Sequence, residues 1–165
     1  MRISVGLNLG NFVRELPKFF QNKDAFITEL IQNSYRAGAT AIDITCTAKV
    51  FKITDNGHGI KDMRDIFIIA QSGWEKTNVS QLDPAGMGIF SAFLTADTVE
   101  VDTWRTENGV KIIQHASFTK EQILAGHPIY VKDNAKDTFA TASGTAIALF
   151  NSFNVADVQT ECKHC

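Results

Sequence analysis

Three polar side chains with helical spacing lie in the stretch ELIQNSYRAG, namely Glu29, Asn33 and Arg36. Positions i, i+4 and i+7 project from one side of an α-helix, here on the shoulder of an apolar stripe. A carboxylate, an amide and a guanidinium there could orient a water, hold a cation and bind an anion. Taken alone, a solvated helix face with a cation near its C-terminus explains the same residues.

A second candidate is the segment DNGHGI, residues 55–60, which follows a strand-like stretch. Gly57 and Gly59 would let the backbone bend sharply against a flat ligand, while the Asp55 carboxylate accepts hydrogen bonds. Asp-Asn-Gly is also ordinary turn chemistry, so a plain β-turn is the alternative.

Two later segments carry glycines at the start of an element. PAGMGIFSA, residues 84–92, places Gly86 and Gly88 before a helix, whose first N–H groups form an anion site. SGTAIALF, residues 143–150, places Gly144 and Thr145 at the start of an expected strand. Each pattern alone is common.

The elements that must position these residues follow from periodicity and turn signals. A long helix capped by Asn22 or Asp24 should end at Gly38 and bury one apolar face. The turn Asn108-Gly109 predicts a β-hairpin. The full expectation is helices at 11–20, 24–38, 62–70 and 86–94, a hairpin over 41–57, a polar loop at 71–84, and strands at 98–104, 110–118, 127–133 and 145–151; the apolar face of the long helix comprises Phe26, Ile27, Leu30, Ile31 and Ala37.

Helices gather early and strands gather late, which predicts an α+β fold, a two-layer sandwich with a mixed β-sheet and helices on one face. Residues 1–155 should form one domain and residues 156–165 a short tail, whose abrupt end at Cys suggests truncation. Cys162, His164 and Cys165 lack a fourth ligand for zinc, so we expect no metal there.

Composition excludes several functional classes. The 165 residues are 44% hydrophobic and 21% charged, with a formal net charge of −2. This composition is globular, and its charge does not support binding to nucleic acid. The three cysteines form no disulfide framework, and no apolar run spans a membrane. We therefore expect a cytoplasmic protein.

The order of the motifs resembles one family. ExxxN on a helix, a hairpin into DxGxG, a polar loop into GxG and a late GT strand are typical of the GHKL ATPases, which share the Bergerat fold. The family includes histidine kinases, DNA gyrase B subunits, ninety-kilodalton heat-shock chaperones and MutL proteins. ELIQNSYRAGATAIDI and FKITDNGHGI look locally closest to MutL, and MGIFSA is similar to the chaperone version.

The resemblance implies ATP and Mg²⁺ as cofactors and assigns a role to each motif. Glu29 would activate the water that attacks the γ-phosphate, and Asn33 would bind Mg²⁺. Asp55 would accept from the adenine amino group, supported by Thr145. The expected nucleotide-binding residues are Asn33, Arg36, Asp55, Gly57, Gly59, Ile60, Gly86, Met87, Gly88, Ile89, Phe90 and Thr145.

Arg36 departs from the MutL, gyrase and chaperone pattern, which has Asp at this position, whereas histidine kinases often carry Lys or Arg there. Arg36 could neutralise phosphate charge, or it could merely compensate Glu29 or Asp24. A Lys that the MutL and gyrase branches take from a second domain is missing, so a protein partner or second domain would supply that group, or turnover is slow.

We therefore expect a module that binds ATP and ADP and hydrolyses ATP slowly with Mg²⁺, using closure of residues 71–88 as a conformational switch and as a trigger for homodimerisation. The alternatives are a stand-alone histidine or serine protein kinase, favoured by Arg36, and a nucleotide-sensing module without significant turnover.

Overall fold

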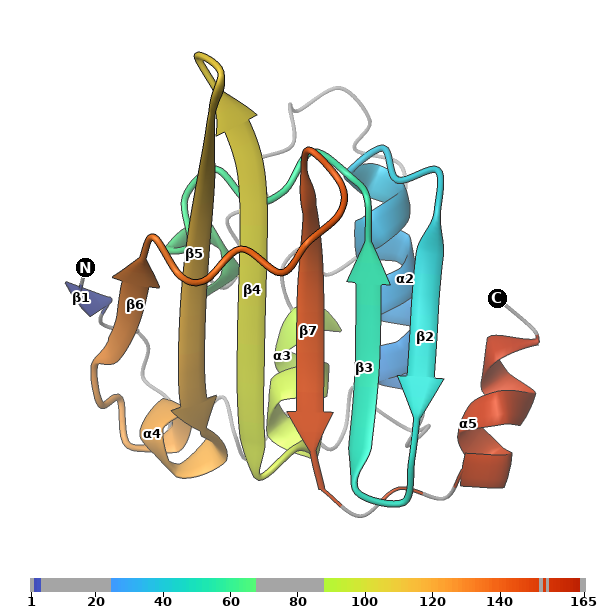
Figure 1. The fold of residues 1–165 in the computed structure, drawn as a ribbon. Helices are drawn as coiled ribbons and strands as arrows, with labels where there is room; N and C mark the ends of the chain where they lie inside the picture. The colour runs from blue at the N-terminus through green and yellow to red at the C-terminus, as the bar shows by residue number, and fades with distance from the viewer. Residues whose placement is uncertain (1, 4–24, 68–87, 152, 154, 164–165) are drawn as a thin grey trace, which may run out of the picture.

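The computed structural model describes residues 2–3, 25–67, 88–151, 153 and 155–163 (Figure 1). Their strands form one seven-stranded sheet with the order β1-β6-β5-β4-β7-β3-β2. Each described strand pair is antiparallel. The strands are β1 (Arg2–Ile3), β2 (Ile42–Cys46), β3 (Val50–Asp55), β4 (Thr98–Glu107), β5 (Val110–Thr119), β6 (Ile129–Asp133) and β7 (Gly144–Phe150).

Helices α2 (Ala25–Arg36) and α3 (Gly88–Thr95) cover one face of this sheet (Figure 1). The expected α+β two-layer fold is confirmed, but the described sheet is antiparallel rather than mixed. The remaining helical elements are the 3₁₀ turn η1 (Asp65–Phe67), α4 (Lys120–Leu124) and α5 (Val155–Cys162). Within the described ranges, no helix has the length and apolarity needed to cross a membrane.

Helix α2 ends as its sequence predicts. Gly38 has a positive φ of 71°. Its N–H donates to the carbonyl of Tyr35 at 3.0 Å, and the N–H of Ala39 donates to the carbonyl of Ser34 at 3.1 Å. This pair of bonds is a Schellman motif, which satisfies carbonyls left unpaired at a helix end and turns the chain toward β2.

The core lies between the helices and the inner face of the sheet. Inner-face residues alternate along each strand with outward-facing ones, which is the period expected of a half-buried sheet. Aromatic rings fill the space beneath α3, where Phe93 and Phe118 pack edge to face with centroids 5.1 Å apart. Large buried apolar groups on this side include Phe26, Ile27, Leu30, Phe51, Met63, Phe67, Phe90, Phe93, Val99, Phe118, Ile123, Ile129 and Leu149.

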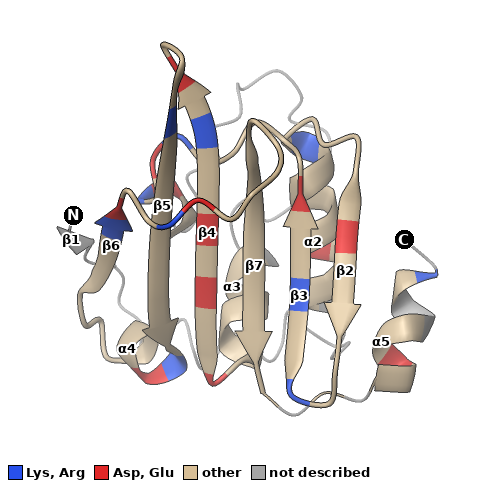
Figure 2. Ribbon diagram, in the orientation of Figure 1, with Lys and Arg blue, Asp and Glu red and all other residues tan. Residues whose placement is uncertain are grey.

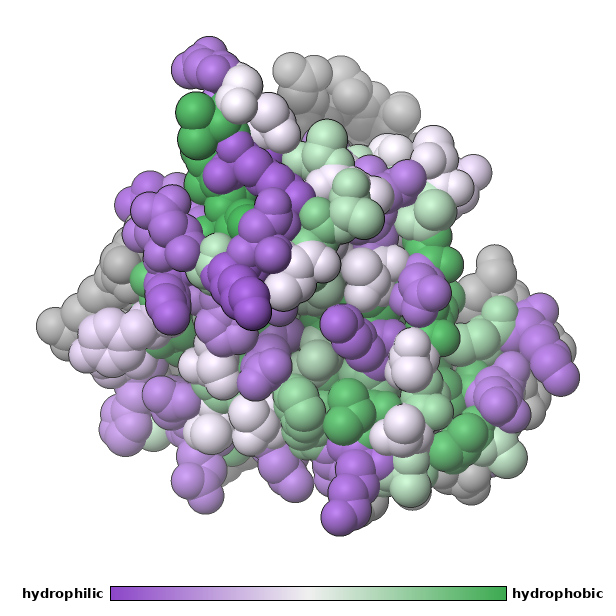
Figure 3. Space-filling view, viewed as in Figure 1, coloured by the Kyte–Doolittle hydropathy of each residue, from purple (hydrophilic) through white to green (hydrophobic). Residues whose placement is uncertain are grey.

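The outer face of the sheet is largely polar. Figure 3 shows hydrophilic side chains over much of it, and Figure 2 shows acidic positions on the central strand β4. Asp102 of β4 lies opposite His115 of β5, whose Nδ1 is 2.7 Å from the Asp102 carboxylate. Such cross-strand pairs stabilise a sheet modestly.

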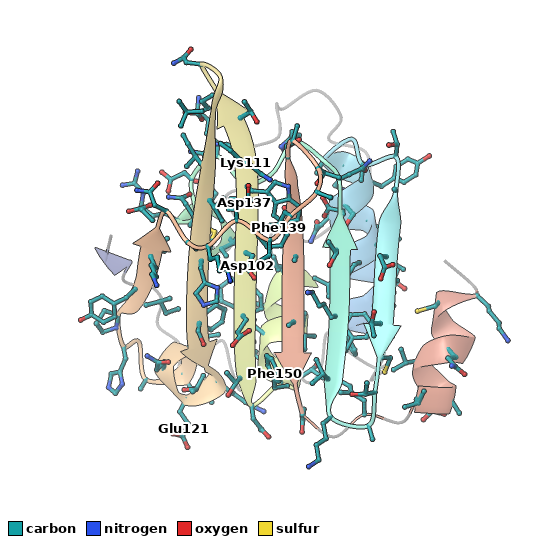
Figure 4. The ribbon with its side chains drawn as sticks, in the orientation of Figure 1. Asp102, Lys111, Glu121, Asp137, Phe139 and Phe150 are labelled. Carbon is teal, nitrogen blue, oxygen red and sulfur yellow. The ribbon has the colours of Figure 1, made fainter. Side chains whose placement is uncertain are left out.

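A strap formed by residues 134–143 crosses this outer face before entering β7 (Figure 1). The ring of Phe139 stacks on Trp104 of β4, with centroids 3.8 Å apart and an interplanar angle of 4°. Lys111 of β5 donates to the Asp137 carboxylate at 2.9 Å and to the Phe139 carbonyl at 2.6 Å (Figure 4). Trp104 Nε1 donates to Thr141 Oγ1 at 3.0 Å. These contacts fasten the strap just before Gly144.

Several local predictions are confirmed. Asn108 and Gly109 have φ values of 51° and 77°, so the β4–β5 hairpin turns through two left-handed residues. The β2–β3 hairpin, α3, β6 and β7 also lie close to their expected positions. The expected helix at 11–20 and the polar loop at 71–84 fall outside the described residues.

Other local predictions are wrong. A helix was expected from Asp62, but up to Phe67 the chain forms only the 3₁₀ turn η1, because the Asp62 carboxylate binds the N–H of Arg64 and closes a tight turn. Helix α4 was not expected. It is short and begins at Thr119, which forms a capping box with Gln122. Within the segment 156–165, residues 156–162 belong to α5. The expected division into a domain and a short tail stays a prediction.

Candidate functional site

Asp55 is the last residue of β3, and two hydrogen bonds hold its carboxylate. It is 8% exposed. One carboxylate oxygen accepts from the N–H of Gly57 at 2.9 Å, and the other accepts from the hydroxyl of Ser34 at 2.9 Å. A carboxylate has about four acceptor positions, so further acceptor capacity remains at both oxygens. This group can therefore receive a hydrogen bond from a ligand.

The polar row continues across the neighbouring strands. Asp55 lies opposite Thr145 of β7, and Thr145 lies opposite Thr103 of β4. All three side chains face the helical layer. Together with Ser34 of α2 they are the buried polar side chains of the described residues, and the remainder of that interior is apolar. Buried polar groups cost free energy unless they are paired, so their concentration at one end of the sheet marks a specialised place.

The turn after Asp55 is pressed against helix and sheet at two glycines. A Cβ on Gly57 would lie 2.8 Å from both the Cβ and the carbonyl oxygen of Ala37. Gly59 has a φ of 73°, and a Cβ there would lie 2.6 Å from the carbonyl oxygen of Trp104. Only glycine permits both the close approach and the left-handed backbone. The spacing Asp55, Gly57, Gly59 is thus required by the packing of the turn.

Asn56 fixes the same turn from its other side. Its side-chain oxygen accepts from the N–H groups of Thr40 and Ala41 at 2.8 and 2.9 Å, and its amide donates to the Thr40 hydroxyl at 2.9 Å. The N–H of His58 donates to the carbonyl of Ala37 at 2.9 Å. The end of α2, the start of β2 and the turn therefore form one hydrogen-bonded unit.

Glu29 and Asn33 lie one helical turn apart on α2, and both are half-buried. Asn33 directly precedes Ser34, the residue that contacts Asp55. Arg36 is exposed, and its Nη1 donates to the Asn33 side-chain oxygen at 3.4 Å. The three residues share one flank of the helix, as their spacing predicts, and this flank adjoins the buried polar row.

Comparison with known proteins places this arrangement in a family. A model described as "Histidine kinase-, DNA gyrase B-, and HSP90-like ATPase" matches residues 23–145, which include α2, the turn after β3 and the start of β7. The chain belongs to this ATPase family.

Chaperones are among the relatives of this chain. It is 30% identical to the chaperone protein HtpG of Cupriavidus taiwanensis, over 56% of this chain and 20% of that protein. It is 29% identical to HtpG of Psychrobacter arcticus, over 63% of this chain and 22% of that protein. The alignments thus cover about one fifth of the length of these relatives.

In an ATPase of this family, the buried polar row and its turn form the candidate site for the nucleotide base. The structure brings together Asp55, Gly57, Gly59, Ile60 and Thr145 from the expected set. Glu29, Asn33 and Arg36 follow along α2, and their contacts with ATP stay predictions.

The expected phosphate-binding segment is described only from its helix onward. Gly86 and Met87 lie outside the described residues, and Gly88 begins α3. The N–H groups of Gly88, Ile89 and Phe90 belong to the first turn of this helix, the end of a helix at which anions bind. The side chain of Phe90 is fully buried and packs on Phe93, so any contact of Phe90 with phosphate would come from its backbone.

Two site residues escaped the sequence-based prediction. Ser34 could have been found, because it follows Ile27 and Leu30 on the buried arc of the helix at the spacing i+7 and i+4. No sequence pattern indicates that Thr103 belongs to the site, since a threonine in an alternating strand is common. Its role depends on contacts with residues distant in the sequence.

Asn33 is the candidate ligand for Mg²⁺. In the described part of the chain, no group of His, Cys, Asp and Glu is arranged to hold a metal. An amide oxygen suits Mg²⁺, which retains waters and takes its other oxygens from phosphates. The same oxygen faces the Arg36 guanidinium at 3.4 Å, so Arg36 would have to give up this weak contact when the cation binds.

Proposed function

We propose that this chain is a nucleotide-binding module that takes up ATP with Mg²⁺ and hydrolyses it slowly. The observation that carries the proposal is the gathering of Ser34, Asp55, Thr103 and Thr145 at one end of an otherwise apolar interior, within the segment matched by the ATPase family. Asp55 supplies an acceptor at the base of this row, and the adenine amino group is the complementary donor.

The base selectivity follows from the Asp55 carboxylate. Adenine presents an amino group at the position where guanine presents a carbonyl oxygen. An ionised carboxylate only accepts hydrogen bonds, so it attracts the amino group and repels the carbonyl. Its two oxygens are already held by Ser34 and Gly57, so the acceptor is oriented before the ligand arrives.

Hydrolysis in this proposal depends on Glu29. Its carboxylate would orient and activate the attacking water, and Asn33 would hold the Mg²⁺ that accompanies the phosphates. When bound, Mg²⁺ supplies neutralisation of the phosphate charge. Arg36 adds a second positive charge from the same helix flank. The expected closure of residues 71–88 over the nucleotide stays a prediction from the resemblance, because residues 71–87 lie outside the described ranges.

The proposal is tested by thermal unfolding and isothermal titration calorimetry with ATP, ADP and GTP in the presence of Mg²⁺. A nucleotide at about 100 times its Kd should add roughly 2.7 kcal/mol to the free energy of unfolding. ATP and ADP should both stabilise the chain and GTP should not. Equal stabilisation by GTP would contradict the role of Asp55.

Asp55→Asn gives a sharper test, because it replaces one carboxylate oxygen with an NH₂ group. That NH₂ would then face a hydrogen-bond donor, either the Ser34 hydroxyl or the Gly57 N–H. ATP affinity should fall by at least about tenfold, a loss of about 1.4 kcal/mol. Asp43→Asn is the matched control, since Asp43 is an exposed carboxylate on the adjacent strand β2. It should leave ATP affinity unchanged.

The protein kinase alternative rests on Arg36, which is exposed at the C-terminal end of α2. Incubation with γ-labelled ATP separates the two chemistries, since an ATPase releases labelled phosphate whereas a kinase transfers it to protein. A sensing module would bind the nucleotide and do neither.

The curated relatives are several times longer than the aligned segment, so their whole-chain activities are not carried over. Homodimerisation on nucleotide binding, and a partner or second domain that completes the phosphate site, remain part of the proposal. Light scattering with a non-hydrolysable ATP analogue tests the first, because the measured mass should double.

A further inference from the structure

The backbone of Ile60 is held at both of its polar groups by one strand. The Thr103 hydroxyl of β4 accepts from the Ile60 N–H at 2.7 Å. Arg105, two residues further along β4, donates from Nη1 to the Ile60 carbonyl at 3.2 Å. We propose that Thr103 and Arg105 are positioning residues for the nucleotide. By binding the backbone of Ile60, they hold the turn from Asp55 to Ile60 against β4, in the position that receives the base. This inference rests on the proposed function.

Thr103 joins the two halves of the candidate site. Its side chain is fully buried on the inner face of β4 and lies in register with Thr145. Its hydroxyl also donates to the carbonyl of Gly144 at 3.2 Å. One hydroxyl therefore links the turn after β3 to the first residue of β7. A hydroxyl offers one proton and two lone pairs, and both kinds of bond are used here.

The backbone of the turn needs hydrogen-bond partners outside the strand ladder, because the paired part of β3 ends at Asp55. Gly59 is left-handed, and its Cα approaches the Trp104 carbonyl so closely that a Cβ would lie 2.6 Å from that oxygen. The next N–H, from Ile60, points to Thr103. If Thr103 could not accept this bond, a partly buried donor would be left unsatisfied and the turn would relax away from β4.

Arg105 binds the carbonyl of Ile60, at the more exposed side of the same turn. Its side chain is 15% exposed and is held by Glu107 Oε1 at 2.7 Å and by Gln114 Oε1 at 3.4 Å. Three acceptors thus fix the guanidinium, which limits its freedom to leave Ile60. Removing the guanidinium should loosen the turn less than removing the buried hydroxyl, because water can replace it at the rim.

The test compares four variants by steady-state ATP hydrolysis and by calorimetric binding of ADP. Thr103→Val keeps the shape and removes the acceptor, so the KM for ATP and the Kd for ADP should both rise by about tenfold. The kcat at saturating ATP should stay within about twofold, since Glu29 on α2 is untouched. Thr103→Ser retains the hydroxyl and should restore binding to within about threefold of the wild type.

Thr119→Val is the matched structural control. Thr119 also accepts a hydrogen bond from a backbone N–H, that of Gln122 at 3.2 Å, but at the far end of β5. It should lower the melting temperature without changing the KM. An unchanged KM in Thr103→Val, or an equal rise in Thr119→Val, would overturn the proposal.

If the Thr103→Val chain does not fold, Arg105→Met tests the same positioning role. It should raise the KM by about threefold with an unchanged kcat. An unaltered KM in this variant would then reject the positioning role. Failure of the wild-type chain to bind any adenine nucleotide would instead reject the proposed function, so the two failures are distinguishable.

Discussion

The hydroxyl of Ser34 donates to the Asp55 carboxylate at 2.9 Å, which joins helix α2 directly to the end of strand β3. The same oxygen lies 3.2 Å from the carbonyl of Leu30, one turn back along the helix. Ser34 is 4% exposed. The helix that carries Glu29 and Asn33 is therefore hydrogen-bonded to Asp55, the acceptor proposed for the base. A substitution that moves one of these two segments should also move the other.

Ser34→Ala removes this tie without adding bulk. We expect the free energy of unfolding to fall by about 1.5–3 kcal/mol, because a hydrogen bond to a charged group is lost. ATP affinity should fall by about threefold or more as Asp55 gains freedom. Urea unfolding and calorimetry measure both effects. Gln32→Ala, at an exposed position of the same helix, should change neither.

Glu29→Gln tests the proposed activation of water. The amide is isosteric but cannot accept a proton, so kcat should fall by about 10²–10⁴-fold. The Kd for ATP should change little, because the base site is untouched. Phosphate release under single-turnover conditions measures the chemical step. An unaltered rate would remove Glu29 from the mechanism.

Gly57→Ala tests the close packing between the turn and α2. Its Cβ would overlap the Cβ and the carbonyl oxygen of Ala37, so the two segments must separate. We expect a loss of about 1–3 kcal/mol in the free energy of unfolding, together with weaker ATP binding. Gly109→Ala places the new Cβ in open space at a φ of 77° and should cost about 1 kcal/mol from backbone strain alone. It should not alter ATP binding.

The strap should stabilise the fold in a pH-dependent manner. The hydrogen bond from Lys111 holds the pKa of Asp137 below its ordinary value of 3.8. A carboxyl whose pKa is lowered by folding contributes stability above its unfolded pKa and loses that contribution as the pH falls through its folded pKa. Asp137→Asn should therefore lower the melting temperature slightly at pH 7 and have no effect well below pH 3.8.

Lys111→Met should show the same pH-dependent loss, because it removes the other partner of the pair. It should also show a loss that persists at low pH, because it removes the bond to the Phe139 carbonyl. Lys136→Met is the control, because Lys136 is an exposed cation within the same strap. A constant difference between Asp137→Asn and the wild type at every pH would show that the ion pair does not contribute.

The parts predicted correctly from sequence were those set by local chemistry. Gly38, the Asn108-Gly109 pair and the glycines after Asp55 each serve a backbone geometry that other residues adopt poorly, so their positions could be read directly. The motif order supplied the family. Contacts of Glu29, Asn33, Arg36 and Thr145 with a nucleotide remain predictions.

The parts missed depend on distant partners. Periodicity shows that residues 145–151 favour a strand, but not that this strand enters between β3 and β4 and makes the sheet antiparallel. Thr103 acquires its role only when Ile60 and Gly144 arrive beside it. Helix α4 escaped because it is a single short turn whose cap, Thr119, also ends a strand.

The central place of β7 has a consequence for biosynthesis. Among the described residues it is the last strand in sequence, and it lies between β3 and β4 in the sheet. A nascent polypeptide therefore cannot assemble the proposed base pocket until residues 144–150 have emerged from the ribosome. Until then both neighbouring strands present an open edge, which is the state most exposed to chaperone capture or aggregation. Ligand-assisted folding could begin only at the end of translation of this domain.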